Sequence, residues 1–180
     1  MFMNTSDRSH TEAVERTGVW KLDPATADIR FSARGLWGLL SVSGRFRHAS
    51  GSMTWNQDGT ASVLLEVQAA SITTGMAMRD RHLRGAEFLD VQAHPVIIFS
   101  GHAIGHGETR LVVTGKLVVR DAAMEVQLDV EFEPDASGLV AATTARIDVS
   151  AFGVVPRSGI ARPNVDLELR GRAHQTSSMP

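Results

Sequence analysis

Apolar and polar residues alternate along much of this chain with the period of a β-strand. The clearest segment covers residues 124–133, where every second residue is apolar and the residues between them are Glu, Gln or Asp. A second segment, residues 165–172, repeats the pattern with charges of both signs. Because successive side chains of a strand point to opposite faces, each segment predicts a strand with one apolar face and one charged face.

Weaker alternation extends this prediction over most of the chain. The further strands that we expect are residues 28–34, 42–48, 51–55, 62–68, 96–102, 110–119 and 139–147. Polar turns that contain glycine separate several of them, at residues 56–59, 105–107 and 134–138, and most connections are too short for parallel crossovers. Eight or more antiparallel strands leave open edges unless the sheet closes, so the pattern favours an all-β antiparallel barrel.

One segment interrupts the strands. After Gly75, the apolar residues become irregularly spaced among residues compatible with a helix, and we expect a short helix over residues 78–83. Pro95 then blocks a helix and starts the next strand. Residues 1–17 and 174–180 are polar and lack periodicity, so we expect two terminal tails around a single domain at residues 18–173.

Composition and charge narrow the function classes. A chain of 180 residues and 19.4 kDa fits one domain, and 18 Lys and Arg against 20 Asp and Glu provide no net positive field for binding nucleic acid. The absence of cysteine excludes disulfides and thiolate metal sites. No segment is apolar over the length of a signal peptide or of a membrane span, so we expect a soluble, cytoplasmic protein without a transmembrane segment.

Catalytic motifs are not found in the sequence. It has no nucleophile elbow, no His-Glu-x-x-His and no phosphate-binding loop, and Ser158 has no evident base. His94, His102 and His106, with Glu108, raise the alternative of a metal site. However, residues 94 and 102 are about 25 Å apart along an extended chain, which favours exposed histidines. We expect no catalytic residues, no metal and no cofactor.

Residues 79–84 form the densest charge cluster of the chain. Three arginines there, Arg79, Arg81 and Arg84, could grip an anionic group. The alternative is a solvated helix in which Asp80 and Glu87 pair with neighbouring arginines. The sequence leaves both interpretations open.

The order of these features resembles the YceI-like family of lipid-binding proteins. Several blocks carry the resemblance, and the stretch RDRHLRGAEFLDVQAHPVIIFSG from residue 79 is the most distinctive. The others are residues 19–24 (VWKLDP), 29–32, 42–46, 70–75, 116–120 and 151–154. The resemblance implies a lipocalin-like, eight-stranded antiparallel β-barrel with one short helix inserted between strands, which holds a polyisoprenoid.

The chain departs from the family pattern at three places. Gly35 stands where relatives often have a histidine, and Arg120-Asp121 stands where they have Arg-Gly. The usual Arg-x-Asp-Phe-Gly block has lost both of its charged members, which become Val149 and Ala151. Losing both partners of an ion pair together leaves no unpaired charge behind. If these positions face the cavity, we expect a more apolar pocket than in relatives.

The function that the resemblance implies is non-catalytic binding, storage or transport of a long apolar ligand, such as a polyisoprenoid or a prenyl quinone. We expect the ligand to contact aromatic residues and the helical segment. The candidate ligand-binding residues are Phe31, Trp37, Phe46, Arg79, His82, Leu83, Phe88, Phe99 and Phe152.

Two alternatives remain open from the sequence. A small enzyme could use the barrel to bind a hydrophobic substrate, with Arg79, Asp80 and His82 as its polar group. A barrel filled by its own side chains could instead act through its surface, as a homodimer or with a partner in a stress response.

Overall fold

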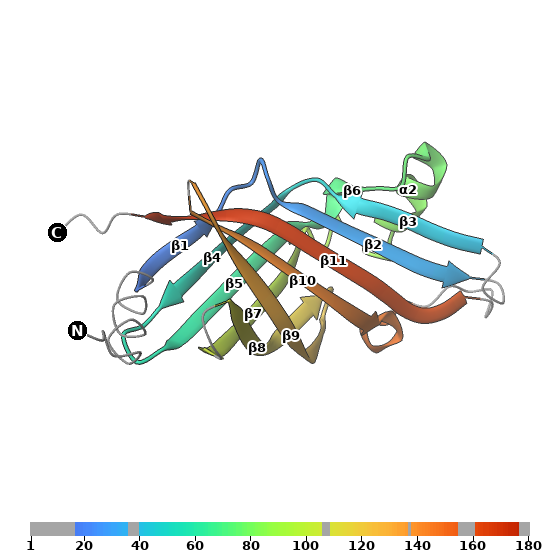
Figure 1. The fold of residues 1–180 in the computed structure, drawn as a ribbon. Coiled ribbons are helices and arrows are strands. Elements are labelled where there is room, and N and C mark those ends of the chain that lie inside the picture. Colours follow the sequence, from blue (N-terminus) through green and yellow to red (C-terminus); the bar gives the residue numbers. More distant parts are fainter. Residues whose placement is uncertain (1–16, 36–39, 106–108, 137, 155–160, 177–180) are drawn as a thin grey trace, which may run out of the picture.

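A computed structural model describes residues 17–35, 40–105, 109–136, 138–154 and 161–176, and most of these lie in strands (Figure 1). The strands are β1 (Gly18–Leu22), β2 (Asp28–Gly35), β3 (Leu40–Phe46), β4 (Ala49–Trp55), β5 (Thr60–Gln68), β6 (Ile72–Thr73), β7 (Val96–Gly105), β8 (Arg110–Val119), β9 (Ala122–Asp135), β10 (Gly138–Asp148) and β11 (Ala161–Thr176). The helical elements are α2 (Ala77–Arg84) and two short 3-10 turns, η2 (Ala69–Ser71) and η3 (Val149–Phe152).

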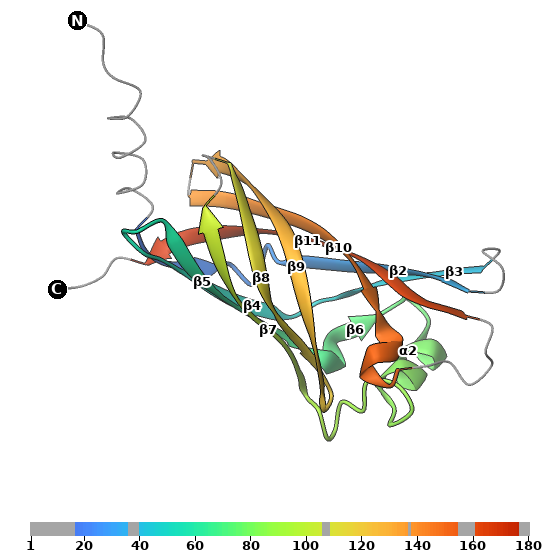
Figure 2. The same ribbon diagram turned by 90° about the horizontal axis from the view of Figure 1, so that it is seen from below.

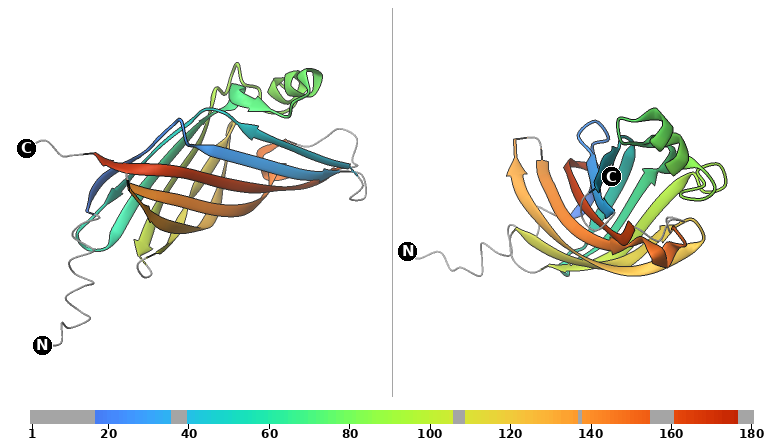
Figure 3. Two further views of the ribbon diagram at one scale, coloured as in Figure 1. Left: turned by 45° about the horizontal axis from the view of Figure 1, so that its top comes forward. Right: turned by 90° about the vertical axis from the view of Figure 1, so that its right-hand side faces the viewer.

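Eight strands close into an antiparallel barrel in the order β1-β4-β5-β7-β8-β9-β10-β11, and β11 pairs back with β1. The end-on view in Figure 3 shows these strands following one another around the barrel. The expected antiparallel eight-stranded barrel is therefore confirmed. The helix expected at residues 78–83 is also confirmed, as α2 between β6 and β7.

The long strand β11 pairs with two strands, β1 and β2, along one edge. Its last residues pair with β1, as in Val19 with Thr176, and its middle pairs with β2, as in Ile29 with Leu169. β2 continues into β3 and then β6, which form an extension of the sheet beyond the closed ring. Figures 1 and 2 place α2 beside β6, at the end of the barrel opposite β1.

Three apolar clusters fill parts of the interior. The largest includes Trp20 and Trp55, and the rings of Trp55 and Phe132 lie with their centroids 6.3 Å apart. A second surrounds Ile29 near β2, and the third surrounds Phe152 of η3. Burial of these side chains provides the main stabilisation of the barrel, because apolar surface removed from water stabilises in proportion to its area.

The boundaries of the fold differ slightly from the sequence expectation. β11 continues to Thr176, three residues beyond the expected domain end, because residues 174–176 pair with β1. The turn at residues 56–59 joins β4 to β5, and Gly59 adopts a φ of 81° there. Within the described ranges, no helix has the length and the apolar content needed to cross a bilayer.

Candidate functional site

The inward side chains of β9 keep part of their apolar surface exposed. Met124, Val126, Leu128 and Val130 all contact the apolar clusters, so they point into the barrel, yet each remains partly exposed. On the neighbouring strand β8, Leu111 and Val113 are only 1% and 2% exposed. Since a filled interior packs at nearly crystalline density, partial exposure of inward side chains indicates an apolar lumen beside the filled part of the barrel.

Glycines on the wall allow aromatic rings to lie against the backbone. Gly101 and Gly115 are paired across β7 and β8, and both lie under the ring of Phe99. A Cβ atom at Gly115 would meet the Ser100 carbonyl oxygen and would lie 2.9 Å from Cζ of Phe99. Phe31 covers Gly44 in the same way, with its Cζ 2.6 Å from the place of a Cβ. Glycine at these positions therefore lets a ring tip pack against the backbone of the wall.

The predicted aromatic ligand contacts fall into two groups. Phe31 and Phe46 are half-buried on β2 and β3, with ring centroids 5.8 Å apart. Phe99 and Phe152 are 5% and 4% exposed and belong to two separate apolar clusters. Trp37 lies outside the described residues. Among these four described rings, Phe31 and Phe46 retain the most surface for contact with a ligand.

The other predicted residues lie on α2 and in the segment after it. Arg79 is half-buried, and its guanidinium donates to the hydroxyl of Thr74 at 2.8 Å and to the Thr74 carbonyl at 3.1 Å. His82 is exposed and meets the edge of Phe88, with ring centroids 4.7 Å apart. Leu83 and Phe88 are half-buried. This group lies at the end of the barrel near β6, and its contact with a ligand stays a prediction.

Asp80 is the buried acidic residue of α2, with 7% of its surface exposed. Its carboxylate accepts hydrogen bonds from the backbone N–H of Thr74 at 2.7 Å, from the Thr74 hydroxyl at 2.5 Å and from the Thr73 hydroxyl at 2.9 Å. The Thr74 hydroxyl is the main cause that lowers the pKa of Asp80, and the positive charge of Arg84 adds to it. An ionised carboxylate with these donors holds the segment before α2 in place.

The histidines considered for a metal are spread over the fold. His102 points outward from β7, where Nδ1 lies 3.4 Å from the hydroxyl of Ser62, and Nε2 of His94 lies 3.5 Å from the Asp121 carboxylate. His106 and Glu108 lie outside the described residues. Among the residues with described positions, no group of three or more histidines and acids is arranged to hold a metal ion.

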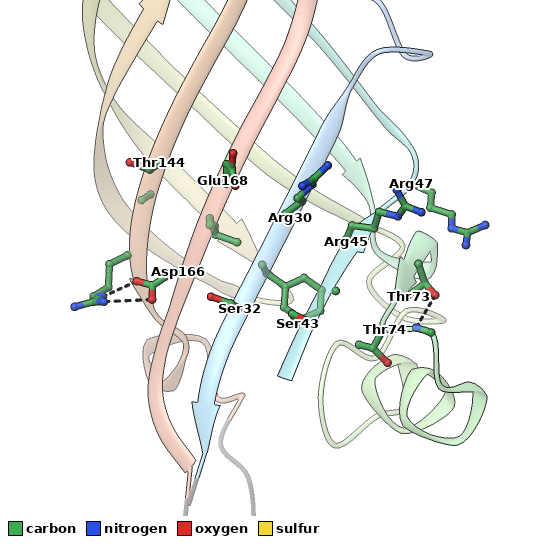
Figure 4. A pocket seen from close by; sticks show the side chains of 16 residues that line it. Arg30, Ser32, Ser43, Arg45, Arg47, Thr73, Thr74, Thr144, Asp166 and Glu168 are labelled. Carbon is green, nitrogen blue, oxygen red and sulfur yellow. Dashed lines mark hydrogen bonds and ion pairs between the residues drawn. The ribbon is translucent and has the colours of Figure 1, made fainter. Parts of the chain in front are cut away.

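A groove of about 1010 Å³ crosses the outer face of β10, β11, β2 and β3 (Figure 4). The pairing of β2 with β3 places Arg30 beside Arg45, and Arg47 follows two residues later. Asp166 and Glu168 of β11 line the groove beyond β2, and Asp166 is paired with Arg146. The sequence reasoning missed this arginine row, although Arg45 and Arg47 both fall on one face of the strand expected at residues 42–48.

The departures from the family pattern have different surroundings. Val149 packs against the cluster of Phe152, whereas Ala151 is exposed, so only Val149 adds apolar surface to the interior. Arg120 has a φ of 57° in the turn between β8 and β9, and its guanidinium donates to the Phe88 carbonyl at 3.2 Å. Gly35 lies at the end of β2, where it pairs with Leu40 of β3 and Ala161 of β11.

Comparison with known proteins identifies the family. The family model described as a YceI-like domain matches residues 20–173. The chain belongs to the YceI-like family. Curated relatives include a UPF0312 protein of Vibrio cholerae, 27% identical over 158 residues that cover 82% of both chains. A UPF0312 protein of Pseudomonas putida is 26% identical over 143 residues, or 73% of both chains.

Solved structures show that the fold is shared at low sequence identity. This YceI-like chain is similar to BcnA of Burkholderia cenocepacia, with a TM-score of 0.75 and 19% identity over 86% of this chain and 99% of the other. It is also similar to a polyisoprenoid binding domain from Saccharophagus degradans, with a TM-score of 0.69 and 14% identity over 87% and 98% of the two chains. These likenesses confirm the architecture.

Proposed function

We propose that this protein binds a long apolar molecule in the barrel lumen and stores or transports it without catalysis. The observation that carries the proposal is the inward row of β9, whose apolar side chains remain partly exposed although they point into the barrel. An apolar ligand lying along this row would remove that surface from water. The structural likeness to a polyisoprenoid binding domain supports a polyisoprenoid or a prenyl quinone as the ligand class.

The energetics favour exchange with a membrane over extreme affinity. Burial stabilises by about 0.8 kcal/mol per methylene, so a tail of about forty carbons corresponds to a gross gain of about 30 kcal/mol relative to water. This exceeds the ceiling of roughly 18–21 kcal/mol for non-covalent affinity, but the competing environment is the bilayer interior, which is equally apolar. A lumen that is as favourable for the apolar tail as the bilayer interior is therefore sufficient for storage or delivery.

The polar residues of α2 favour binding over catalysis. Asp80 uses both carboxylate oxygens within the protein, Arg79 is engaged by Thr74, and His82 faces solvent beside Phe88. A general base must reach the proton that it removes, whereas Asp80 and Arg79 are both bound to Thr74 and His82 meets the Phe88 ring.

Native mass spectrometry of protein purified without detergent tests the proposal. The probe is a polyprenyl quinone with a tail of about forty carbons, added from ethanol, and a water-soluble quinone without a tail is the control. We expect one bound long-tailed molecule per chain and no retained tailless quinone. A mass equal to the bare chain after incubation with the long-tailed probe would refute the proposal.

The same spectrum reads the oligomeric state, so it also tests the homodimer that we keep as part of the proposal. A cytoplasmic location is a further part of it, and fractionation of cells with an antibody against the chain is the corresponding test. Recovery of the protein in the periplasmic or secreted fraction would correct that location.

A further inference from the structure

Two exposed methionines stand at the start of α2. Met76 is 58% exposed and Met78 is 84% exposed, and only Ala77 separates them. Within the described ranges, Leu64 and Ile104 are the other large apolar residues with high exposure, and they lie on different strands. A pair of neighbouring exposed apolar side chains indicates an interaction site more strongly than single ones do.

The groove lined by Arg30, Arg45 and Arg47, called the arginine groove below, ends beside these methionines. Gly75, the residue before Met76, lines the groove together with Thr73 and Thr74. Arg45 is paired with Thr73 in the sheet, so Arg45 lies beside the segment that leads from β6 into α2. Figure 4 shows Arg45 of β3, and Arg47 just after that strand, next to the segment that carries Thr73 and Thr74.

Arg45 and Arg47 are free to meet an external anion. In the described part of the chain, the salt bridges of the arginines that line the groove link Arg30 to Asp28 and Arg146 to Asp166, and none engages Arg45 or Arg47. The acids of the groove, Asp166 and Glu168, lie across β2 from Arg45. Arg45 and Arg47 are both exposed, so a planar anionic surface can reach them from solvent.

Charge is also distributed unevenly over the molecule. Residues 45–48 and 73–84 contain five arginines and one acid, Asp80, whereas the whole chain has a net charge of −2. Asp80 is buried, so solvent meets mainly the cations of this end. The rest of the molecule is therefore acidic, and such an asymmetry orients a protein at a charged surface.

We propose that this end of the barrel docks on an anionic lipid bilayer, with Met76 and Met78 entering the interfacial layer and Arg45 and Arg47 contacting lipid phosphates. An apolar tip flanked by arginines matches the layered chemistry of a bilayer surface, in which charged headgroups lie above acyl chains. This inference rests on the proposed function and deepens it. An apolar ligand that is exchanged with a membrane must pass between the bilayer surface and the barrel. Each arginine near an anionic surface strengthens binding by about fivefold.

Vesicle co-sedimentation of the full chain tests the docking surface. The probes are vesicles of phosphatidylcholine alone and of phosphatidylcholine with about one third phosphatidylglycerol, at low and at high salt. We expect binding to the anionic vesicles only, and its loss at high salt. Arg45→Gln with Arg47→Gln should weaken binding by about 25-fold, and Met76→Ser with Met78→Ser by about tenfold.

A matched control variant is available elsewhere on the surface. Ile104→Ser with Arg110→Gln removes one exposed apolar side chain and one exposed arginine from β7 and β8, and it should leave vesicle binding unchanged. Equal binding to neutral and anionic vesicles, or equal binding of all three variants, would overturn the docking surface. A different outcome would be binding of poly-glutamate that is as strong as binding of vesicles, with no loss in the methionine variant. That result would overturn the docking surface in favour of an acidic protein partner.

The two proposals fail separately. If the chain retains the long-tailed quinone in native mass spectrometry but does not sediment with anionic vesicles, the docking surface is wrong and the proposed function stands. If it sediments as expected but retains no quinone, the docking surface is supported and the proposed function is wrong.

Discussion

The carboxylate of Asp80 and the backbone N–H of Thr74 are joined by a hydrogen bond of 2.7 Å, and the Thr74 hydroxyl donates to the same oxygen. This double contact fixes the segment between β6 and α2, to which Arg79 is also bound through Thr74. The placement of α2 at the end of the barrel therefore rests partly on one buried acid, beside the bond from Arg84 to the Ile72 carbonyl.

Asp80→Asn should lower the melting temperature by a few degrees, because a neutral amide oxygen is a weaker acceptor than the carboxylate and the amide NH2 cannot accept from the Thr73 hydroxyl. Thermal unfolding followed by circular dichroism is the measurement. Asp58→Asn, in the exposed turn between β4 and β5, is the matched control, since Asp58 also accepts hydrogen bonds, from Thr60. An equal loss in both variants would contradict a special role for Asp80.

The contribution of Asp80 to the stability of the fold should fall on acidification. Hydrogen bonds from Thr74 lower its pKa below the ordinary value of 3.8, so the folded state favours the ionised carboxylate. The resulting stability is complete above the pKa of the unfolded chain and is lost as the pH falls through the folded pKa. The difference in unfolding midpoint between the wild type and Asp80→Asn should therefore be constant near neutral pH and shrink below pH 3.8. A difference that grows on acidification would contradict this.

Leu128→Trp should reduce ligand uptake by about tenfold or more, because the larger side chain occupies the lumen that the ligand would fill. Leu128 points inward and is partly exposed, whereas Gln127 beside it is exposed on the outer face of β9. Gln127→Trp adds the same indole outside the barrel and should leave uptake unchanged. Titration with the long-tailed quinone, read by native mass spectrometry, distinguishes them, and equal uptake by both variants would exclude binding along this part of the lumen.

Gly115→Ala should destabilise the barrel by about 2 kcal/mol or more, because the added methyl group meets the backbone of β7 and the Phe99 ring. Lys116→Ala, at an exposed position on the same strand, should change the free energy of unfolding by less than about 0.5 kcal/mol. Denaturant unfolding measures both. A tolerated Gly115→Ala would show that the ring of Phe99 does not rest on this wall.

Phe152→Ala should cost about 3–5 kcal/mol of stability, because its ring is fully packed in an apolar cluster. Phe31→Ala should cost less, since Phe31 is only half-buried, but it should weaken quinone uptake. Denaturant unfolding and the quinone titration, made on both variants, separate packing from ligand contact. Unchanged uptake in Phe31→Ala would remove that residue from the ligand site.

The sequence alone was sufficient for the local elements but not for their long-range arrangement. The alternation at residues 124–133 predicts β9, because a strand with one wet face imposes a period of two on its own residues. The division of β11 between β1 and β2 leaves no such trace, since it depends on pairings between segments more than a hundred residues apart.

The candidate site was predictable to a similar extent. Phe31 and Phe46 follow from the apolar faces of their strands, and the structure brings their rings together. The role of Asp80 was not visible, because its hydrogen-bond donors are on β6 and in the loop after it rather than on neighbouring turns of α2. The arginine groove was not visible either, because Arg30 and Arg45 become neighbours only through the register of β2 and β3.

The pairing of Val19 with Thr176 also sets the order of events during synthesis. The Thr176 hydroxyl donates to the Val19 carbonyl across a separation of 157 residues, so the ring of strands cannot close until the last strand has left the ribosome. Until then, the apolar rows of the earlier strands have no complete barrel to enclose them. Folding should therefore be slow for a chain of this size, and a nascent chain stalled before β11 should be a good substrate for chaperones that bind exposed apolar strands.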